Sequence, residues 1–227
     1  METFRIVYLV GCLLILGYYV FKHICLKNKK KQVMEYEHEN MKISKEDLQY
    51  NLQSVNSWLN NCDQKAGILL TVVGVAVTVI MTSDFMKFLR EYIFLPFMNY
   101  CSGNHDLSFS WSRFSVFLLL IIAMVILITC CHYLFQVISA NIDYEKMRKE
   151  NPDLVKTSYF FFRSISRMNY CDFKKGGVEY GEDLKSQIYV NSKIATTKFE
   201  KYNESLFWFK LLLVVSILLF IAILFVN

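Results

Sequence analysis

The chain has 227 residues, of which 54% are hydrophobic and only 20% charged, and its net charge is +5. The hydrophobic residues gather in four long runs, which leaves too few for a separate soluble core, so the composition indicates an integral membrane protein. Basic residues near spans set topology and contact anionic lipid, and this interpretation of the charge is favoured over nucleic-acid binding.

The first apolar run lies between Arg5 and Lys22 and is short for a hydrocarbon layer of about 30 Å, although both flanking side chains can reach the headgroups. A run of lysines follows it and no small-x-small cleavage site is present, so a retained span is favoured over a signal peptide. We therefore expect residues 1–34 to form a transmembrane anchor with a basic stop-transfer segment.

Residues 35–65 are expected to form an amphipathic helix. Apolar residues recur there at spacings of four, three and four: Leu48, Leu52, Val55 and Leu59. Ser44 followed by Asp47 is a helix-start signal, and neither proline nor glycine occurs from Ser44 to Ala66. The helix is therefore expected to continue directly into a second span, at about residues 66–83.

The second span carries small and hydroxyl side chains on one helical face, again at spacings of four, three and four: Gly67, Thr71, Gly74 and Thr78. Small residues let helices approach closely, and threonines hydrogen-bond across an interface. This face is interpreted either as a helix-packing surface, within or between copies of the chain, or as the lining of a pore.

The third span is expected at about residues 114–136. Its helix is expected to extend through Lys149 and to end near Asn151, because a residue that precedes proline resists helix. The following residues, 157–181, are expected to be less regular, with a short interfacial helix in the aromatic part and a loop around the glycines.

The fourth span is expected at about residues 206–226, and residues 182–210 are expected to lead into it as one unbroken helix. Basic residues are abundant in segments 22–65 and 143–210 but sparse in 84–113. The positive-inside rule then places the two basic segments in the cytoplasm, and an even number of spans places both termini outside.

Polar residues gather where the two long helices are expected to enter the membrane. The candidate ligand-binding residues are Asn60, Asp63, Lys65, Gln187, Asn191 and Lys198, with Trp58 and Asp183 beside them. Amides and lysines bind nucleotide phosphates or bases, but they equally satisfy one another as a structural network. The network is favoured, since buried polar groups near a membrane need partners.

No enzyme signature is present, and neither the four scattered histidines nor the seven cysteines, which include no CxxC pair, indicate a metal site or a cofactor. No charged residue lies deep in a span, which argues against an ion-coupled transporter.

Two segments carry a family resemblance. SWLNNCDQKAGILLTVVGV, residues 57–75, resembles the W-x4-D-x-K-A…G segment of the Pycsar effector transmembrane family, and DLKSQIYVNSKIATTKFEKYNESLF, residues 183–207, resembles its second signature. YFFFRSIS is similar to the aromatic stretch between them. The resemblance covers about residues 45–227 and leaves the first span outside.

The resemblance implies a bacterial antiphage role at the inner membrane. In Pycsar systems a partner nucleotide cyclase makes cyclic CMP or cyclic UMP after infection, and the membrane effector senses this messenger and impairs the membrane. Unlike some effectors, this chain has no recognisable cyclic-nucleotide-binding barrel. A directly bound nucleotide would therefore need a site in the helical stem or between copies of the chain; alternatively, a partner senses it.

We thus predict an all-α membrane protein with about four transmembrane helices and cytoplasmic helical extensions, in which residues 35–227 form the Pycsar-effector-like domain. It is expected to be a homo-oligomer in the lipid bilayer, neither an enzyme nor a nucleic-acid binder. The alternative is a passive membrane scaffold or accessory subunit without a ligand.

Overall fold

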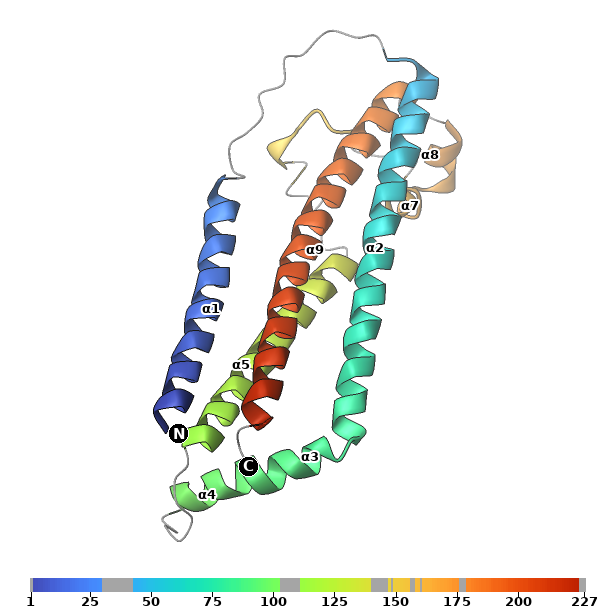
Figure 1. Cartoon of the computed structure of the whole chain (residues 1–227). Coiled ribbons are helices and arrows are strands. Elements are labelled where there is room, and N and C mark those ends of the chain that lie inside the picture. Colours follow the sequence, from blue (N-terminus) through green and yellow to red (C-terminus); the bar gives the residue numbers. More distant parts are fainter. Residues whose placement is uncertain are drawn as a thin grey trace. The chain divides into compact units, whose positions relative to one another are not determined.

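The computed structural model describes residues 2–29, 43–102, 111–139, 147, 149–155, 158–159, 161–175 and 179–224, and all regular elements in these ranges are helical (Figure 1). They are α1 (Glu2–Lys29), α2 (Lys45–Thr82), α3 (Phe85–Phe88), the π-helix η1 (Leu89–Phe94), α4 (Leu95–Cys101), α5 (Trp111–Ile138), α7 (Phe162–Ile165), α8 (Tyr170–Lys175) and α9 (Tyr180–Leu224). The predicted all-α class is confirmed.

Among the described residues, three helical segments are long and apolar enough to cross a membrane: Lys45–Thr82, Arg113–Ile138 and Tyr180–Leu224. The first expected span falls on α1, whose described apolar part, Val10–Cys25, is shorter. The structure therefore confirms a membrane protein with several candidate spans. The lysines from position 30 onward, and the expected helix before residue 43, lie outside the described residues.

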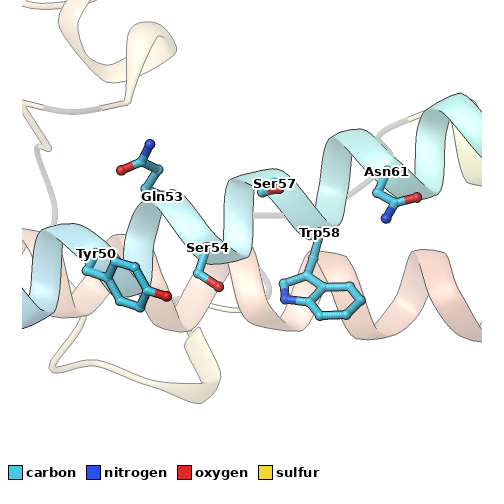
Figure 2. A pocket seen from close by; sticks show the side chains of 6 residues that line it. All are labelled: Tyr50, Gln53, Ser54, Ser57, Trp58 and Asn61. Atoms are coloured by element: carbon cyan, nitrogen blue, oxygen red, sulfur yellow. The ribbon is translucent and has the colours of Figure 1, made fainter.

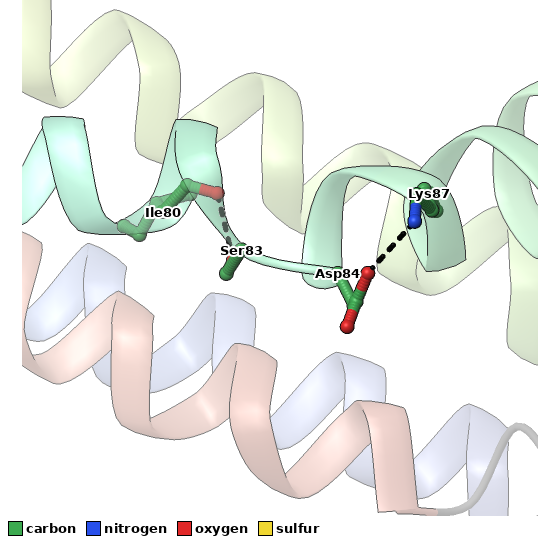
Figure 3. A network of polar contacts seen from close by, with 4 residues as sticks. All are labelled: Ile80, Ser83, Asp84 and Lys87. Atoms are coloured by element: carbon green, nitrogen blue, oxygen red, sulfur yellow. Dashed lines mark hydrogen bonds and ion pairs between the residues drawn. The ribbon is translucent and has the colours of Figure 1, made fainter.

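Helix α2 begins and ends at identifiable polar signals. The Ser44 hydroxyl accepts a hydrogen bond from the Asp47 amide at 3.1 Å, and Asp47 accepts one from the Ser44 amide at 3.3 Å, which is the reciprocal capping predicted from the sequence. At the other end, Ser83 donates to the Ile80 carbonyl, and Lys87 pairs with Asp84 across the turn that opens α3 (Figure 3).

Two local predictions are wrong. Helix α5 ends at Ile138 with a bend at Ser139, so it is not the unbroken extension to Lys149 that was expected. Lys149 and Glu150 are helical again and Asn151 is not, which agrees with the expected helix end near Asn151. The segment expected to be a glycine-rich loop begins with the short helix α8, whereas its glycines at 176–177 lie outside the described residues.

The chain divides into two compact units. The first, here called the apolar unit, comprises Met1–Glu37, Leu70–His132 and Glu204–Asn227. One of its clusters joins α1, α5 and α9 through Leu16, Ile126, Leu211 and Val215. His23 of α1 also stacks on Phe207 of α9, with ring centroids 3.7 Å apart, and lies 3.7 Å from a Glu204 oxygen.

The sequence did not reveal the helical connection between α2 and α5. Elements α3, η1 and α4 lie in the segment predicted only as an extracytoplasmic connection. Leu89 and Ile93 of η1 are buried against Val116 and Leu119 of α5 and Ala222 of α9. This connection is therefore a packed part of the apolar unit.

The second unit, here called the polar unit, comprises His38–Leu69 and Tyr133–Asn203. Within it, the first part of α2 pairs with the first part of α9. Gln49 donates to Tyr180, Asn191 to Asn56 and Lys198 to Asp63, with sequence separations of 131, 135 and 135 residues. Because the separation is nearly constant, the two helices run parallel.

Candidate functional site

An ion pair joins the two long helices of the polar unit. Lys198 of α9 donates to Asp63 of α2 at 2.5 Å. The two side chains differ in their contact with solvent, since that of Lys198 is 9% exposed and that of Asp63 is 42% exposed. The ammonium is thus largely enclosed, while water reaches the carboxylate.

Two neutral groups, the Cys62 thiol and the Tyr202 hydroxyl, lie next to this pair along α2 and α9. Burial raises the pKa of the Cys62 thiol, and the neighbouring Asp63 raises it further. Burial also raises the pKa of the Tyr202 hydroxyl, with a smaller contribution from Cys62. Both groups therefore stay protonated near neutral pH, and they add no charge to that of Asp63 and Lys198.

A second polar contact lies two helical turns before the ion pair. Asn191 of α9 donates its side-chain amide to the Asn56 side-chain oxygen of α2 at 2.9 Å. Asn56 was not predicted as a site residue. Its signal in the sequence is a shared spacing: Asn56 precedes Asp63 by seven residues, and Asn191 precedes Lys198 by seven residues. When α2 and α9 run parallel, the Asn56–Asn191 pair and the Asp63–Lys198 pair therefore lie on the same seam between the two helices.

The other predicted residues are divided between buried and exposed positions. Gln187 is 4% exposed, whereas Asn60 and Lys65 are exposed. Gln187 also lies eleven residues before Lys198, about 16 Å along the helix. The six residues therefore do not converge on one point: Asp63 meets Lys198, Asn191 meets Asn56, and Asn60 lies on the outer face of α2.

Asp183, which the sequence placed beside this cluster, has a different position. It is 1% exposed in the first turn of α9, and one of its oxygens accepts a hydrogen bond from the Tyr159 amide at 2.7 Å. Asp183 thus anchors the segment before α7, fifteen residues away from Lys198.

Trp58 lies at the edge of a groove between the two helices. Its ring is edge-on to Phe199, with centroids 6.1 Å apart, yet the residue is 56% exposed. The groove has a volume of about 390 Å³ and is lined by Val55, Trp58, Ser192, Ala195, Thr196, Phe199, Glu200 and Asn203. It is open to flat apolar groups, but Glu200 makes it a poor place for a phosphate.

The small-residue face of the second span lies on α2 as expected. Thr78 donates its hydroxyl to the Gly74 carbonyl at 2.9 Å, within the helix. A Cβ atom built at Gly67 or Gly74 would meet no atom within 4 Å in the described structure. Within the described structure, Gly67 and Gly74 therefore each have room for a side-chain Cβ atom.

Among the described residues, no group of three or more His, Cys, Asp or Glu side chains is arranged to hold a metal ion. The described part of the polar unit presents amides, the largely enclosed Lys198 ammonium and aromatic rings. These groups suit the binding of an anion or a base by hydrogen bonding and stacking.

Comparison with known proteins gives two matches. A family model described as the Pycsar effector protein domain, PycTM, matches residues 47–226. The Pycsar effector protein GmPycTM of Gulbenkiania mobilis is 26% identical over 184 residues, which cover 79% of this chain and 90% of that protein. No solved structure matches the chain. The family match includes α2 almost from its start and all of α9, and it leaves α1 outside.

Proposed function

Because the chain belongs to the Pycsar effector protein family, we propose that it is a membrane effector of a bacterial antiphage signalling system. A partner nucleotide cyclase supplies cyclic CMP or cyclic UMP, and the chain responds to this messenger by impairing the inner membrane. The infected cell then dies or stops growing. The chain performs no enzymatic reaction of its own.

The observation that carries the proposal is the continuity of two helices. Helices α2 and α9 run parallel in the polar unit, and each continues without a helix break into residues of the apolar unit. A ligand that binds two arrangements of the helix pair with different affinity shifts the equilibrium between them. Unbroken helices carry such a shift into the membrane.

The proposed ligand site is centred on the Asp63–Lys198 pair, with Lys65 and Asn191 as further members. Gln187 and Asn60, the other two residues expected from the sequence, lie away from this pair. A cyclic nucleotide carries one negative charge on its phosphate, as Asp63 does on its carboxylate, and so competes with Asp63 for the Lys198 ammonium. The exposed Lys65 attracts the same anion. The polar network is then the resting arrangement, which the messenger opens.

The proposed orientation follows the basic residues. The polar unit lies in the cytoplasm, where a cyclase releases its product, and both termini lie outside. The parallel course of α2 and α9 supports this arrangement, because both helices then enter the bilayer from the same side. The effector acts as a homo-oligomer in the lipid bilayer, with the Gly67, Thr71, Gly74 and Thr78 face used for helix packing or for lining a pore.

The proposal is tested by measuring membrane potential with a voltage-sensitive dye in bacteria that express the chain. Cyclic CMP and cyclic UMP are supplied separately, with cyclic AMP as the purine control. Depolarisation with one pyrimidine nucleotide alone is expected. No depolarisation with either would refute the proposed messenger and leave a passive scaffold as the better description.

A second arm tests transmission through α2. Two glycines inserted between Lys65 and Ala66 interrupt the helix, and we expect this variant to reach the membrane but to lose the response. The matched control has the same insertion after Ser102, where α4 has already ended. An unchanged response in the Lys65–Ala66 variant would contradict coupling through the continuous helix.

A further inference from the structure

Helix α2 has an exposed face without charge. Residues 48–62 contain no Asp, Glu, Lys or Arg, although many of them face solvent in the polar unit. Tyr50 is 73% exposed and Trp58 is 56% exposed. Solvated surfaces usually contain roughly a quarter to a third charged residues, whereas the centres of protein interfaces lose charge and gain Tyr and Trp.

Helix α9 of the same unit provides an internal comparison. Its exposed positions include Lys185, which pairs with Glu182 at 2.7 Å, and Lys193, whose ammonium lies 5.5 Å from the centre of the Tyr189 ring. Charged residues are thus present on α9, as on an ordinary solvated helix. Their absence from residues 48–62 is a local property of α2.

The uncharged face follows a regular spacing. Gln53, Ser57, Asn60 and Gln64 recur at intervals of four, three and four, which is the seam of a parallel helix pair. Two shallow grooves lie along it and meet at Gln53, Ser57 and Asn61. Figure 2 shows one of them, with all six lining side chains supplied by successive turns of α2 and the small Ser57 between larger neighbours.

The same spacing continues beyond Gln64 into small residues. Gly67 follows Gln64 by three residues, and Thr71, Gly74 and Thr78 follow at four, three and four. A Cβ atom added at Gly67 or at Gly74 would meet no described atom within 4 Å, so no packing contact in the described structure requires a glycine at either position. Small residues in a membrane helix permit close approach of another helix.

Charge complementarity identifies the second helix. Two copies of a membrane protein have the same orientation, so α2 of one copy meets α2 of the other in parallel, and each seam residue faces its own counterpart. A charged residue would then face a like charge. The seam has none, and Asn and Gln side chains each carry a donor and an acceptor, which makes the face complementary to itself.

We propose that this uncharged face of α2 is a self-association surface, on which α2 of a second copy of the chain packs in parallel along Gln53, Ser57, Asn60 and Gln64. The inference rests on the homo-oligomer in the proposed function and specifies the surface that forms it. An amide seam is weak in water. Confinement in one membrane raises the effective concentration of the copies and makes such a contact sufficient.

The test is site-specific photo-crosslinking of the full chain in native membranes without nucleotide. A photo-reactive amino acid is placed at Gln53 or Asn60, on the seam, and at Asn51 as the matched control, an exposed residue of α2 on the far side from the seam. A product with the mass of two chains is expected from the two seam positions and not from Asn51.

Charge reversal at the seam provides the second arm. With the photo-reactive residue at Gln53, Ser57→Lys alone and Ser57→Glu alone should each lower the two-chain product about tenfold or more, because like charges then face each other. Co-expression of the two variants should restore the product, which a folding defect would not allow.

Equal yields at Gln53 and Asn51, a product containing a different protein, or failure of the mixed charges to restore crosslinking would each overturn the proposal. Since neither arm measures depolarisation, a missing nucleotide response refutes the messenger and leaves this surface standing.

Discussion

Asp63 and Lys198 differ in solvent exposure, so replacing one or the other should lower the free energy of unfolding by different amounts. Asp63→Ala leaves the ammonium of a side chain that is only 9% exposed without its carboxylate, and we expect a loss of about 3 kcal/mol, the low end of the range for an uncompensated buried charge. Lys198→Met keeps the apolar stem and leaves a carboxylate that is 42% exposed, which water solvates. Its expected cost is about 1 kcal/mol.

The assay is thermal unfolding of the purified chain in lipid nanodiscs, followed by far-UV circular dichroism. For a chain of this size, about 3 kcal/mol lowers the midpoint by roughly 6–12 °C, and about 1 kcal/mol lowers it by roughly 2–4 °C. Asp84→Ala is the matched control, because Asp84 pairs with Lys87 at 3.0 Å but both side chains are exposed. No measurable shift is expected for this control.

The double variant separates burial of charge from loss of contact. Asp63→Ala combined with Lys198→Met leaves no ammonium to desolvate, so it should be more stable than Asp63→Ala alone. Equal destabilisation by the two single variants, or an Asp63→Ala variant as stable as Asp84→Ala, would refute the argument that Lys198 is the enclosed member of the pair.

Three further predictions follow from local contacts. Burial raises the pKa of the Cys62 thiol, so its thiolate forms only at higher pH. At neutral pH, maleimide should therefore modify the exposed Cys171 much faster than Cys62, and this difference in rate should shrink as the pH rises. Mass spectrometry of the labelled peptides measures both rates. Ser44→Ala removes the helix cap of α2 and should lower stability by about 1 kcal/mol in the thermal assay; an unchanged midpoint would mean that the cap contributes nothing. His23→Ala removes the ring stack and the Glu204 contact that α1 makes with α9 in addition to the apolar cluster around Leu16. It should increase proteolysis after α1 without preventing membrane insertion, as judged by limited digestion of membranes.

The candidate site was predictable as a set of residues but not as an arrangement. Asp63 and Lys198 were both identified, yet Lys65 and Lys198 were equally available as partners for Asp63. The 135-residue offset selects Lys198, and it also brings in Asn56, which has no distinguishing feature in its own neighbourhood. Gln187 and Asn60 were identified with them, but the structure places Gln187 at a buried position and Asn60 at an exposed one.

Several features were determined by the sequence alone. Long apolar runs establish membrane insertion, the Ser44 and Asp47 pattern starts α2, and two separated motifs indicate the family that residues 47–226 match. These signals are local or additive, because hydropathy, capping and helical periodicity depend on residues within a few turns of one another.

Only the tertiary structure decided the rest: the end of α5 at Ile138, the packing of η1 against α5 and α9, and the pairing of α2 with α9. These features depend on which surfaces meet after folding. Helical periodicity states which residues share a face, but the register between two helices more than a hundred residues apart is set by how their side chains pack and pair, and that information lies in neither helix by itself.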